Sequence, residues 1–369
     1  MSALARAHQA VNLGQGFPDF GWPDGLLERA AQAVREGWNQ YPPMRGLPEL
    51  RDAVAAHYSR RHALDLTAEQ VIVTSGATEA LASSLMALIE PGDEVVLFQP
   101  LYDAYLPLVI RAGGVPRFVR LTPPDWRITA EALAAACSPR TRLILFNNPH
   151  NPTARVFDED ELRLVAESCM RHDALALSDE VWEHVLFDGR RHLPLPSLPG
   201  MAERTVKVGS AGKIFSLTGW KVGWVVAPPN LAEAVAKAHQ FVTFSTAPNL
   251  QSAVAYGLGK PLREVERTCA EFGAARDRLR AGLETEGYAP LAAEGTYFMN
   301  VDLAASGIAV RDVDFCDRAV REAGVAAIPV SAFYAEAPVT NVVRLCFAKQ
   351  PETLTAGIER LGRARALFA

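Results

Sequence analysis

Cysteine is scarce in this chain of 369 residues, which contains five, at positions 137, 169, 269, 316 and 346. They form neither a CxxC pair nor a Cys/His cluster with metal-ligand spacing, which argues against a disulfide-rich domain and a structural metal site. Scattered, unpaired cysteines are typical of reduced thiols. We therefore expect a cytoplasmic protein that binds no metal.

Long hydrophobic runs are also lacking. No uncharged stretch reaches the ~18 residues of a membrane span, and residues 1–12 lack the apolar core of a signal peptide. A basic excess is missing too, since 37 Lys+Arg face 42 Asp+Glu for a net charge of −5. Because nucleic-acid binders need such an excess, we expect no nucleic acid and no membrane as partners.

Short apolar runs recur between amphipathic helical patterns, and most of them are nearly continuous. Such runs are typical of parallel strands buried on both faces by helices. The predicted strands are Val71–Thr74, Glu94–Phe98, Arg117–Leu121, Arg142–Phe146, Ala174–Ser178, Thr205–Val208 and Val222–Ala227. They predict an α/β/α sandwich with a mainly parallel seven-stranded sheet.

After Gly257 the pattern changes to a long charged helix over 262–287, an apolar strand over 297–303 and further helices and a strand to the end. This order is typical of an α+β domain. We expect a large domain over 35–257 and a small domain made of 1–34 and 258–369.

Ligands of open parallel sheets bind at the carboxyl ends of the strands, so the residues there are the candidates for a site. Ser75, Gly76 and Ala77 open a helix after the first strand, as a phosphate site or an ordinary N-cap would. A proline-braced loop after the fourth strand presents Asn151, and Asp179 ends the fifth. Polar loops are often plain turns, but an acid at the end of an apolar run needs a cationic partner.

Two lysines, Lys213 and Lys221, follow the sixth strand among small and apolar residues. Most lysines are solvated surface groups, whereas one in apolar surroundings has a lowered pKa and becomes a usable nucleophile. Lys213 facing Asp179 from a neighbouring strand end would supply an amine for a Schiff base and an acid for a pyridinium nitrogen. Pyridoxal 5'-phosphate requires this pair from a protein.

Four motifs together resemble the class I pyridoxal-phosphate aminotransferases, and most of all the kynurenine aminotransferase (glutamine transaminase) and bacterial methionine aminotransferase group. They are NLGQGFPDF at 12–20, NNPHNP at 147–152, SDEV at 178–181 and SAGKIFSLTGWKVGW at 210–224. The resemblance runs from Asn12 to Lys349. It implies the type I fold of pyridoxal-phosphate-dependent transferases.

The resemblance implies a role for each matching residue. Lys213 would form the Schiff base and shuttle the substrate proton, and Asp179 would hold the pyridine nitrogen protonated. Asn151 would bind the cofactor's phenolate oxygen and lie near the substrate carboxylate. The phosphate would be held by Ser75, Gly76, Ala77, Ser210 and Lys221, and Tyr102 would stack on the ring.

Further matches concern the substrate and a second subunit. Arg344, in an apolar strand, would grip the substrate carboxylate, although an arginine there could instead pair with a structural acid. Gly16 would lie near the same carboxylate, and Phe244 and Ser245 would line the side-chain pocket. Tyr41 matches a tyrosine that crosses to the neighbouring subunit's phosphate, so we expect a homodimer with shared active sites.

The sequence departs from the family at two places. Trp182 stands where the family usually has a tyrosine that binds the cofactor oxygen, and an indole can donate a hydrogen bond but cannot ionise. We expect Trp182 to contact the cofactor, with the rate and the pKa of the Schiff base open. The chain also begins close to Asn12, where relatives carry a longer segment, which leaves the completeness of its start open.

The leading hypothesis is a ping-pong transaminase that takes the amino group of methionine, glutamine, phenylalanine or kynurenine and passes it to a 2-oxo acid. Arg45 could instead serve an acidic substrate. Cysteine-S-conjugate β-elimination and a succinyldiaminopimelate-type aminotransferase are the alternatives. A cofactor-binding regulator is disfavoured, because the catalytic core accounts for the whole chain.

Overall fold

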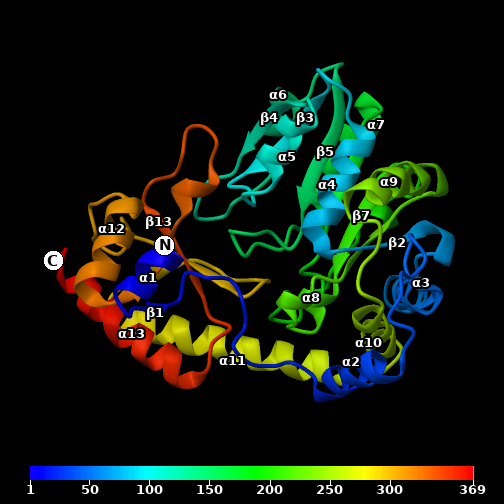
Figure 1. Ribbon diagram of the computed structural model, residues 1–369. Helices are drawn as coiled ribbons and strands as arrows, with labels where there is room; N and C mark the ends of the chain where they lie inside the picture. The colour runs from blue at the N-terminus through cyan, green and yellow to red at the C-terminus, as the bar shows by residue number, and fades with distance from the viewer. Residues whose placement is uncertain (369) are drawn as a thin grey trace.

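The computed structural model describes residues 1–368, which form a large α/β unit and a smaller α+β unit, with the long helix α11 (Arg263–Thr285) running between them (Figure 1). The large unit contains a seven-stranded sheet of order β2-β8-β7-β6-β5-β3-β4. Its strands are β2 (Val71–Thr74), β3 (Glu94–Gln99), β4 (Val115–Arg120), β5 (Thr141–Asn147), β6 (Leu175–Asp179), β7 (Thr205–Ser210) and β8 (Gly223–Val226). These agree with the predicted strands to within two residues at each end.

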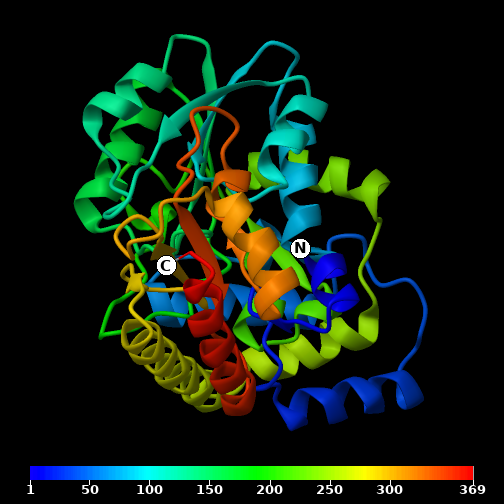
Figure 2. The same ribbon diagram turned by 90° about the vertical axis from the view of Figure 1, so that its left-hand side faces the viewer.

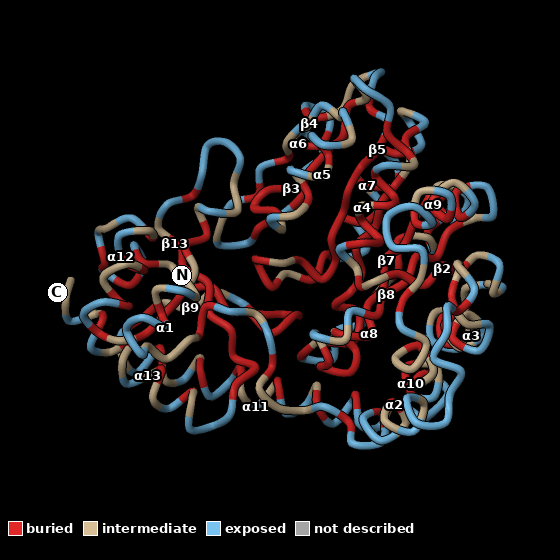
Figure 3. The backbone as a smooth tube through the Cα atoms, viewed as in Figure 1, coloured by how far each residue is buried: buried red, intermediate tan, exposed pale blue. Residues whose placement is uncertain are grey.

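Helices cover both faces of this sheet because its central strands are apolar on both sides. Val95 and Leu97 of β3 belong to one core cluster, and Val96 and Phe98 belong to another. The first cluster includes residues of α4 (Gly76–Leu88), α5 (Tyr105–Arg111) and α9 (Pro229–Val242), and the second includes residues of α6 (Ala130–Ala136) and α7 (Glu159–His172). The strands are buried between exposed outer helix faces (Figure 3), so the predicted α/β/α sandwich is confirmed.

One strand departs from the parallel arrangement. β8 runs antiparallel to both of its neighbours, β2 and β7, whereas β3 to β7 pair in parallel. The chain returns from β7 through the short helix α8 (Ala211–Ile214) and a single 3-10 turn, with no helix crossing a face of the sheet. A parallel pairing would need such a crossover.

Local sequence signals set the ends of several helices. Asp158 caps α7: its carboxylate accepts from the Glu161 N–H at 3.0 Å, and Glu161 accepts in return from the Asp158 N–H at 3.1 Å. This reciprocal capping box satisfies two N–H groups that the helix cannot pair internally. Within residues 1–368, no helix is both long and apolar enough to cross a membrane.

A third apolar cluster joins the edge of the sheet to α3 (Pro48–His62) and α10 (Pro248–Leu258). Val71 and Val73 of β2 and Trp224 of β8 contribute to it from the strands. Helix α2 (Asp24–Glu36) contributes Leu26 and lies against α10, on the side of the large unit.

The small unit is built on an antiparallel sheet of order β12-β13-β10-β9. Its strands are β9 (Ala289–Pro290), β10 (Phe298–Asp302), β12 (Ile328–Pro329) and β13 (Val342–Cys346), and its helices include α12 (Asp312–Arg318) and α13 (Pro351–Ala366). The N-terminal segment, with α1 (Ser2–Ala7) and β1 (Val11–Asn12), joins this unit because β1 pairs in parallel with β11 (Val325–Ala326). Figure 2 shows the two termini on this side of the molecule.

Candidate active site

A cavity of about 450 Å³ lies at the carboxyl ends of β5, β6 and β7, between the first turn of α4 and the small unit. Its lining brings together residues that the sequence placed at separate strand ends. Among the predicted site residues, it contains Gly16, Gly76, Ala77, Tyr102, Asn151, Asp179, Trp182, Ser210, Lys213, Lys221 and Arg344.

The first turn of α4 forms an anion cradle on one wall of the cavity. Gly76 has a φ of +78°, and a Cβ added there would lie 3.1 Å from the Nζ atom of Lys221. The ammonium of Lys221 therefore reaches the helix N-terminus, where free N–H groups and the helix dipole attract an anion. Ser210 ends β7 and lines the same cavity. Because a side chain at residue 76 would fill this space, the cradle fits a phosphate group.

Ser75 lies just outside this cradle. Its N–H donates to Glu79 Oε2 at 3.0 Å, and its hydroxyl pairs with Thr246 Oγ1 at 3.0 Å. The lining of the cavity begins at Gly76. The predicted contact between Ser75 and the phosphate stays a prediction.

Asp179 presents a buried carboxylate at the end of β6. It accepts a hydrogen bond from the Tyr105 hydroxyl at 2.7 Å, and the Val181 N–H lies 3.3 Å from its Oδ1. Burial raises the pKa of this carboxyl above its ordinary value. Within residues 1–368 no basic side chain forms an ion pair with it. A protonated ring nitrogen in the cavity would supply the missing positive partner.

Lys213 carries the amine that faces Asp179 across the cavity. It lies in the short helix α8 directly after β7, and burial lowers its pKa to about 8. Its Nζ lies 4.5 Å from the centre of the Trp182 ring and donates to the Tyr297 hydroxyl at 3.0 Å. Half of the amine is therefore neutral near pH 8, and the neutral form is the one that attacks an aldehyde.

Arg344 projects into the cavity from β13 with much of its hydrogen-bonding capacity free. One guanidinium nitrogen donates to Asn151 Oδ1 at 2.7 Å, another lies 3.4 Å from the Gly14 carbonyl, and the buried Nε has no partner. Burial lowers its pKa to about 10. No acid forms an ion pair with it within the described chain, which argues against the structural ion pair considered from the sequence. The guanidinium is placed to receive a carboxylate.

Aromatic rings form the rest of the wall. Tyr102 lines the cavity and packs edge-on against Tyr105, with 5.5 Å between the ring centres. Trp182 is buried and packs edge-on against Tyr297 at 4.4 Å. The ring centres of Phe298 and Phe333 lie 3.9 and 4.8 Å from the central carbon of the Arg344 guanidinium. Arg344 is therefore flanked by aromatic rings as well as by the polar Asn151.

Three predicted site residues lie away from this cavity within the single chain. Tyr41, with 82% of its surface exposed, packs edge-on against Phe244 at 5.6 Å between ring centres. Ser245 lines a second hollow of about 440 Å³ together with residues 39–42 and 246–248. These residues form one exposed patch, and the single chain does not bring them to Lys213.

A buried polar network behind the site was not predicted from the sequence. Lys207 of β7 donates to Glu183 at 2.9 Å and lies 3.2 Å from Glu180, and Tyr58 of α3 also donates to Glu183 at 2.8 Å. His192 pairs with Glu180 at 2.7 Å. Since Lys207 pairs in register with Ser178, its side chain lies on the face of the sheet opposite to Asp179.

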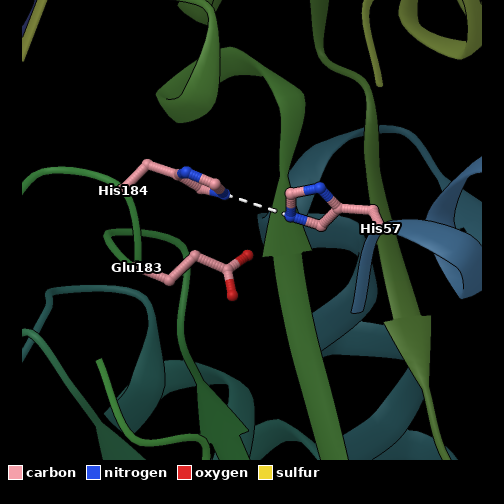
Figure 4. A group of neighbouring side chains, drawn as sticks. All are labelled: His57, Glu183 and His184. Carbon is pink, nitrogen blue, oxygen red and sulfur yellow. Dashed lines mark hydrogen bonds between the residues drawn. The ribbon is translucent and has the colours of Figure 1, made fainter. Parts of the chain in front are cut away.

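Two histidines border the network. His57 and His184 approach each other with 3.2 Å between their Nε2 atoms, and Glu183 lies beside them (Figure 4). Burial lowers the pKa of both imidazoles, so they pair as neutral rings. Burial alone would lower the pKa of Lys207, but Glu180 and Glu183 raise it well above its ordinary value. The cation at the centre of this cluster is therefore the Lys207 ammonium.

The sequence contained a signal for Lys207, since it is the only charged residue in the apolar run over 205–208. The same reasoning that singled out Lys213 applies to it. Tyr297 gave no such signal, because an aromatic residue before an apolar strand is ordinary core composition. Tyr105 was likewise indistinguishable from a packing residue.

Together, an amine of lowered pKa, a buried unpaired acid and an anion cradle at the strand ends define a pyridoxal-phosphate enzyme. The groups fit the aldehyde, the ring nitrogen and the phosphate of the cofactor, respectively. The arginine beyond them adds a place for the carboxylate of an amino acid.

Comparison with known proteins agrees with this class. The sequence profile of the family described as aminotransferase class I and II matches residues 8–361. Methionine aminotransferase from Escherichia coli (strain K12) is 41% identical over 362 residues, which cover 98% of this chain and 94% of that protein. Kynurenine–oxoglutarate transaminase 1 from Mus musculus is 36% identical over 392 residues, covering 97% of this chain and 92% of that protein. The chain belongs to the class I and II aminotransferase family.

Solved structures give the same result. The structure of N-succinyldiaminopimelate aminotransferase from Mycobacterium tuberculosis matches with a TM-score of 0.96 and 43% identity, covering 99% of this chain and 96% of that chain. The predicted family, the type I fold and the dependence on pyridoxal phosphate are confirmed, and the protein is an aminotransferase.

Proposed function

We propose that this aminotransferase acts on neutral amino acids with a sulfur-containing or aromatic side chain, and that a 2-oxo acid receives the amino group. The observation that carries this proposal is the pair of aromatic rings beside Arg344, Phe298 and Phe333, in a cavity that Phe17 also lines. Arg45, the candidate for an acidic substrate, instead pairs with Glu233 and donates to the Glu69 carbonyl. Because Arg45 pairs with Glu233 and does not line the cavity, it offers no cation to an acidic substrate side chain within this chain, which supports a neutral side-chain pocket.

We propose the following roles for the residues of the cavity, which their positions support. Bound pyridoxal phosphate supplies an electron sink that stabilises the carbanion formed at the amino acid's Cα. Lys213 would hold the aldehyde carbon of the cofactor and move the Cα proton, Asp179 would hold a protonated ring nitrogen, and Arg344 would orient the substrate carboxylate with Asn151. Lys221, Ser210, Gly76 and Ala77 would hold the phosphate, with Ser75 just outside them, while Tyr102 and Trp182 would bound the ring. A Cβ atom added to Gly16 would lie only 2.6 Å from the Phe298 ring, so this position has no room for a side chain.

The visible absorption of the holoenzyme tests this proposal. Methionine and phenylalanine should bleach the band of the bound cofactor, and a 2-oxo acid should restore it. Aspartate should give a much slower change. A protein that binds pyridoxal phosphate but responds only to aspartate would contradict the neutral-pocket proposal.

A second candidate is an N-succinyldiaminopimelate-type activity, favoured by the TM-score of 0.96 to the Mycobacterium tuberculosis enzyme. The same spectral assay with N-succinyldiaminopimelate separates the two, since the preferred donor gives the larger kcat/KM. Elimination from cysteine conjugates would instead release pyruvate and ammonia without an added oxo acid.

Replacing Arg344 by lysine is expected to lower kcat/KM for methionine by about 10- to 100-fold, mostly through KM, because an ammonium cannot make two parallel bonds to a carboxylate. Steady-state kinetics measure this. Arg163→Lys is the control, since Arg163 forms an exposed pair with Glu159 on α7. The analogue of methionine without its carboxylate serves as a second substrate. If Arg344→Lys lowers kcat/KM equally for this analogue and for methionine, Arg344 does not bind the carboxylate.

We also propose a homodimer with shared sites. Trp38, Tyr41 and Phe241 expose 85%, 82% and 86% of their surface, and Phe244 and Ser245 lie beside them. Burial of these side chains by a second copy would stabilise a dimer and bring Tyr41 to the neighbouring phosphate. Light scattering of the holoenzyme measures the mass, and a monomer with full activity would refute the shared site.

Two further proposals concern organisation and location. We propose that residues 35–257 form one domain and that 1–34 with 258–369 form the other; the pairing of β1 with β11 supports this division, although α2 packs on α10. A cytoplasmic location is proposed because the five cysteines are free thiols.

A further inference from the structure

Tyr297 brings a phenol from the small unit to the reactive amine of the large unit. It directly precedes β10, and only 1% of its surface is exposed. Its hydroxyl oxygen lies 3.0 Å from Lys213 Nζ and 2.8 Å from the carbonyl oxygen of Gly16. The phenol therefore bridges Lys213 and the N-terminal segment.

The direction of the two hydrogen bonds follows from their chemistry. The Gly16 carbonyl has no proton, so the single proton of the Tyr297 hydroxyl must point to it. Toward Lys213 the phenol can then only accept. A neutral amine has two N–H groups and one lone pair, and an N–H donated to Tyr297 leaves the lone pair free. Burial raises the pKa of Tyr297 well above its ordinary value, so the hydroxyl keeps its proton.

Trp182 cannot accept a hydrogen bond from the Lys213 amine. The indole N–H is a donor only, so it offers no acceptor to an amine. Its ring instead packs edge-on against Tyr297 and lies 4.5 Å from Lys213 Nζ. The indole thus packs against both the phenol and the amine, and it forms a hydrogen bond with neither.

We propose that Tyr297 is a further catalytic residue, which accepts a hydrogen bond from the Lys213 amine and so directs its lone pair toward the substrate proton. The proposal rests on the proposed role of Lys213 in moving that proton. Tyr297 supplies a phenol next to the reacting amine in a chain that has Trp182 where a phenol was expected. The hydroxyl takes up and releases no proton itself; the proton passes between Cα and Lys213 Nζ.

The test compares Tyr297→Phe with the wild-type holoenzyme. With methionine, the rate of Cα proton removal in the half-reaction should fall by about 10- to 100-fold, as expected for loss of one bond to a group that becomes charged. Because proton transfer then limits turnover more strongly, the isotope effect with α-deuterated methionine should increase. KM for methionine reports separately on the lost bond to the Gly16 carbonyl, because Gly16 is assigned a place near the substrate carboxylate, whereas the rate of proton removal and the isotope effect report on Lys213.

A second readout uses the apoprotein and needs no turnover. Reductive methylation of Lys213 with formaldehyde, followed peptide by peptide by mass spectrometry, should show a midpoint near pH 8 in the wild type. Loss of the acceptor destabilises the ammonium, so the midpoint in Tyr297→Phe should move to lower pH. Replacing Tyr297 by 3-fluorotyrosine keeps the shape of the ring and should give a smaller shift in the same direction.

Tyr288→Phe is the matched control, because Tyr288 also donates to a backbone carbonyl, that of Leu361, at 2.8 Å in the small unit. It should retain the wild-type isotope effect and the wild-type Lys213 midpoint. A wild-type isotope effect and midpoint in both Tyr297 variants would overturn the proposal. Failure of the proposed function is distinct, because the wild-type cofactor band would then not respond to methionine.

Discussion

Lys213→Ala should lower kcat for transamination by about 10⁴-fold, the upper end of the range for a positioned acid–base group. The methyl side chain can neither attack the aldehyde nor carry the Cα proton. Lys221 does not replace it, since its ammonium is held at the start of α4, beside Gly76. Single-turnover absorption with methionine, together with a direct measurement of bound pyridoxal phosphate, separates loss of chemistry from loss of cofactor.

Lys237→Ala is the matched control for this experiment. Lys237 lies on α9, and 73% of its side chain is exposed. We expect its kcat to stay within about twofold of the wild type, as for most surface substitutions. A Lys213→Ala protein that binds the cofactor and keeps a tenth or more of the wild-type kcat would show that another group moves the proton.

Lys207→Met should lower the free energy of unfolding by about 3–5 kcal/mol, the usual result of removing one partner from a buried ion pair. The side chains of Lys207, Glu180 and Glu183 are at most 1% exposed, so water cannot solvate the two carboxylates that remain. Methionine fills a similar volume, and the loss is therefore electrostatic rather than a cavity effect. Urea unfolding of the apoprotein measures it, with pyridoxal phosphate omitted because binding would add stability.

The difference in the free energy of unfolding between the wild type and Lys207→Met should depend on pH in a defined direction. The ammonium and His192 lower the pKa of Glu180 to about 2 against the cost of burial, and Lys207 likewise lowers that of Glu183. Their contribution is complete above the ordinary glutamate pKa of 4.5 and is lost as the pH falls through the lowered values. The raised pKa of Lys207 keeps its contribution complete below the ordinary 10.5. The gap between wild type and variant should therefore be widest between these limits.

Two further variants make this prediction specific. Lys237→Met removes the cation of an exposed pair with Glu233 at 3.8 Å and should cost less than about 1 kcal/mol. Adding Glu183→Gln to Lys207→Met removes one of the unpaired charges and should recover part of the lost stability. Equal stability of Lys207→Met and the wild type across the pH range would refute an ion pair at the centre of the network.

The network also connects stability with the site. Glu180 follows Asp179 directly, and Glu183 follows Trp182, so Lys207 holds the backbone of the segment that presents both cavity residues. The cation anchors this segment from behind the sheet. We infer that its removal affects cofactor binding as well as unfolding.

Much of the site could be predicted from the sequence because it is local. Asn151, Asp179 and Lys213 each follow an apolar strand closely, and parallel strand ends meet at one edge of a sheet. The resemblance to the family then added Arg344, whose strand lies in the other unit. The antiparallel direction of β8 could not be predicted, since it depends on how the short segment after β7 returns.

The sequence by itself determined the α/β/α sandwich, the family and the residues facing the cavity, because the periodicity of apolar residues and the polar residues at strand ends are local properties. Only the tertiary structure decided that Lys213 meets Tyr297, 84 residues away, and that Lys207 meets Tyr58, 149 residues away. It also decided that Arg45 pairs with Glu233, outside the residues that line the cavity. Such contacts depend on how separate elements pack, and the sequence near either partner carries no record of the distance between them.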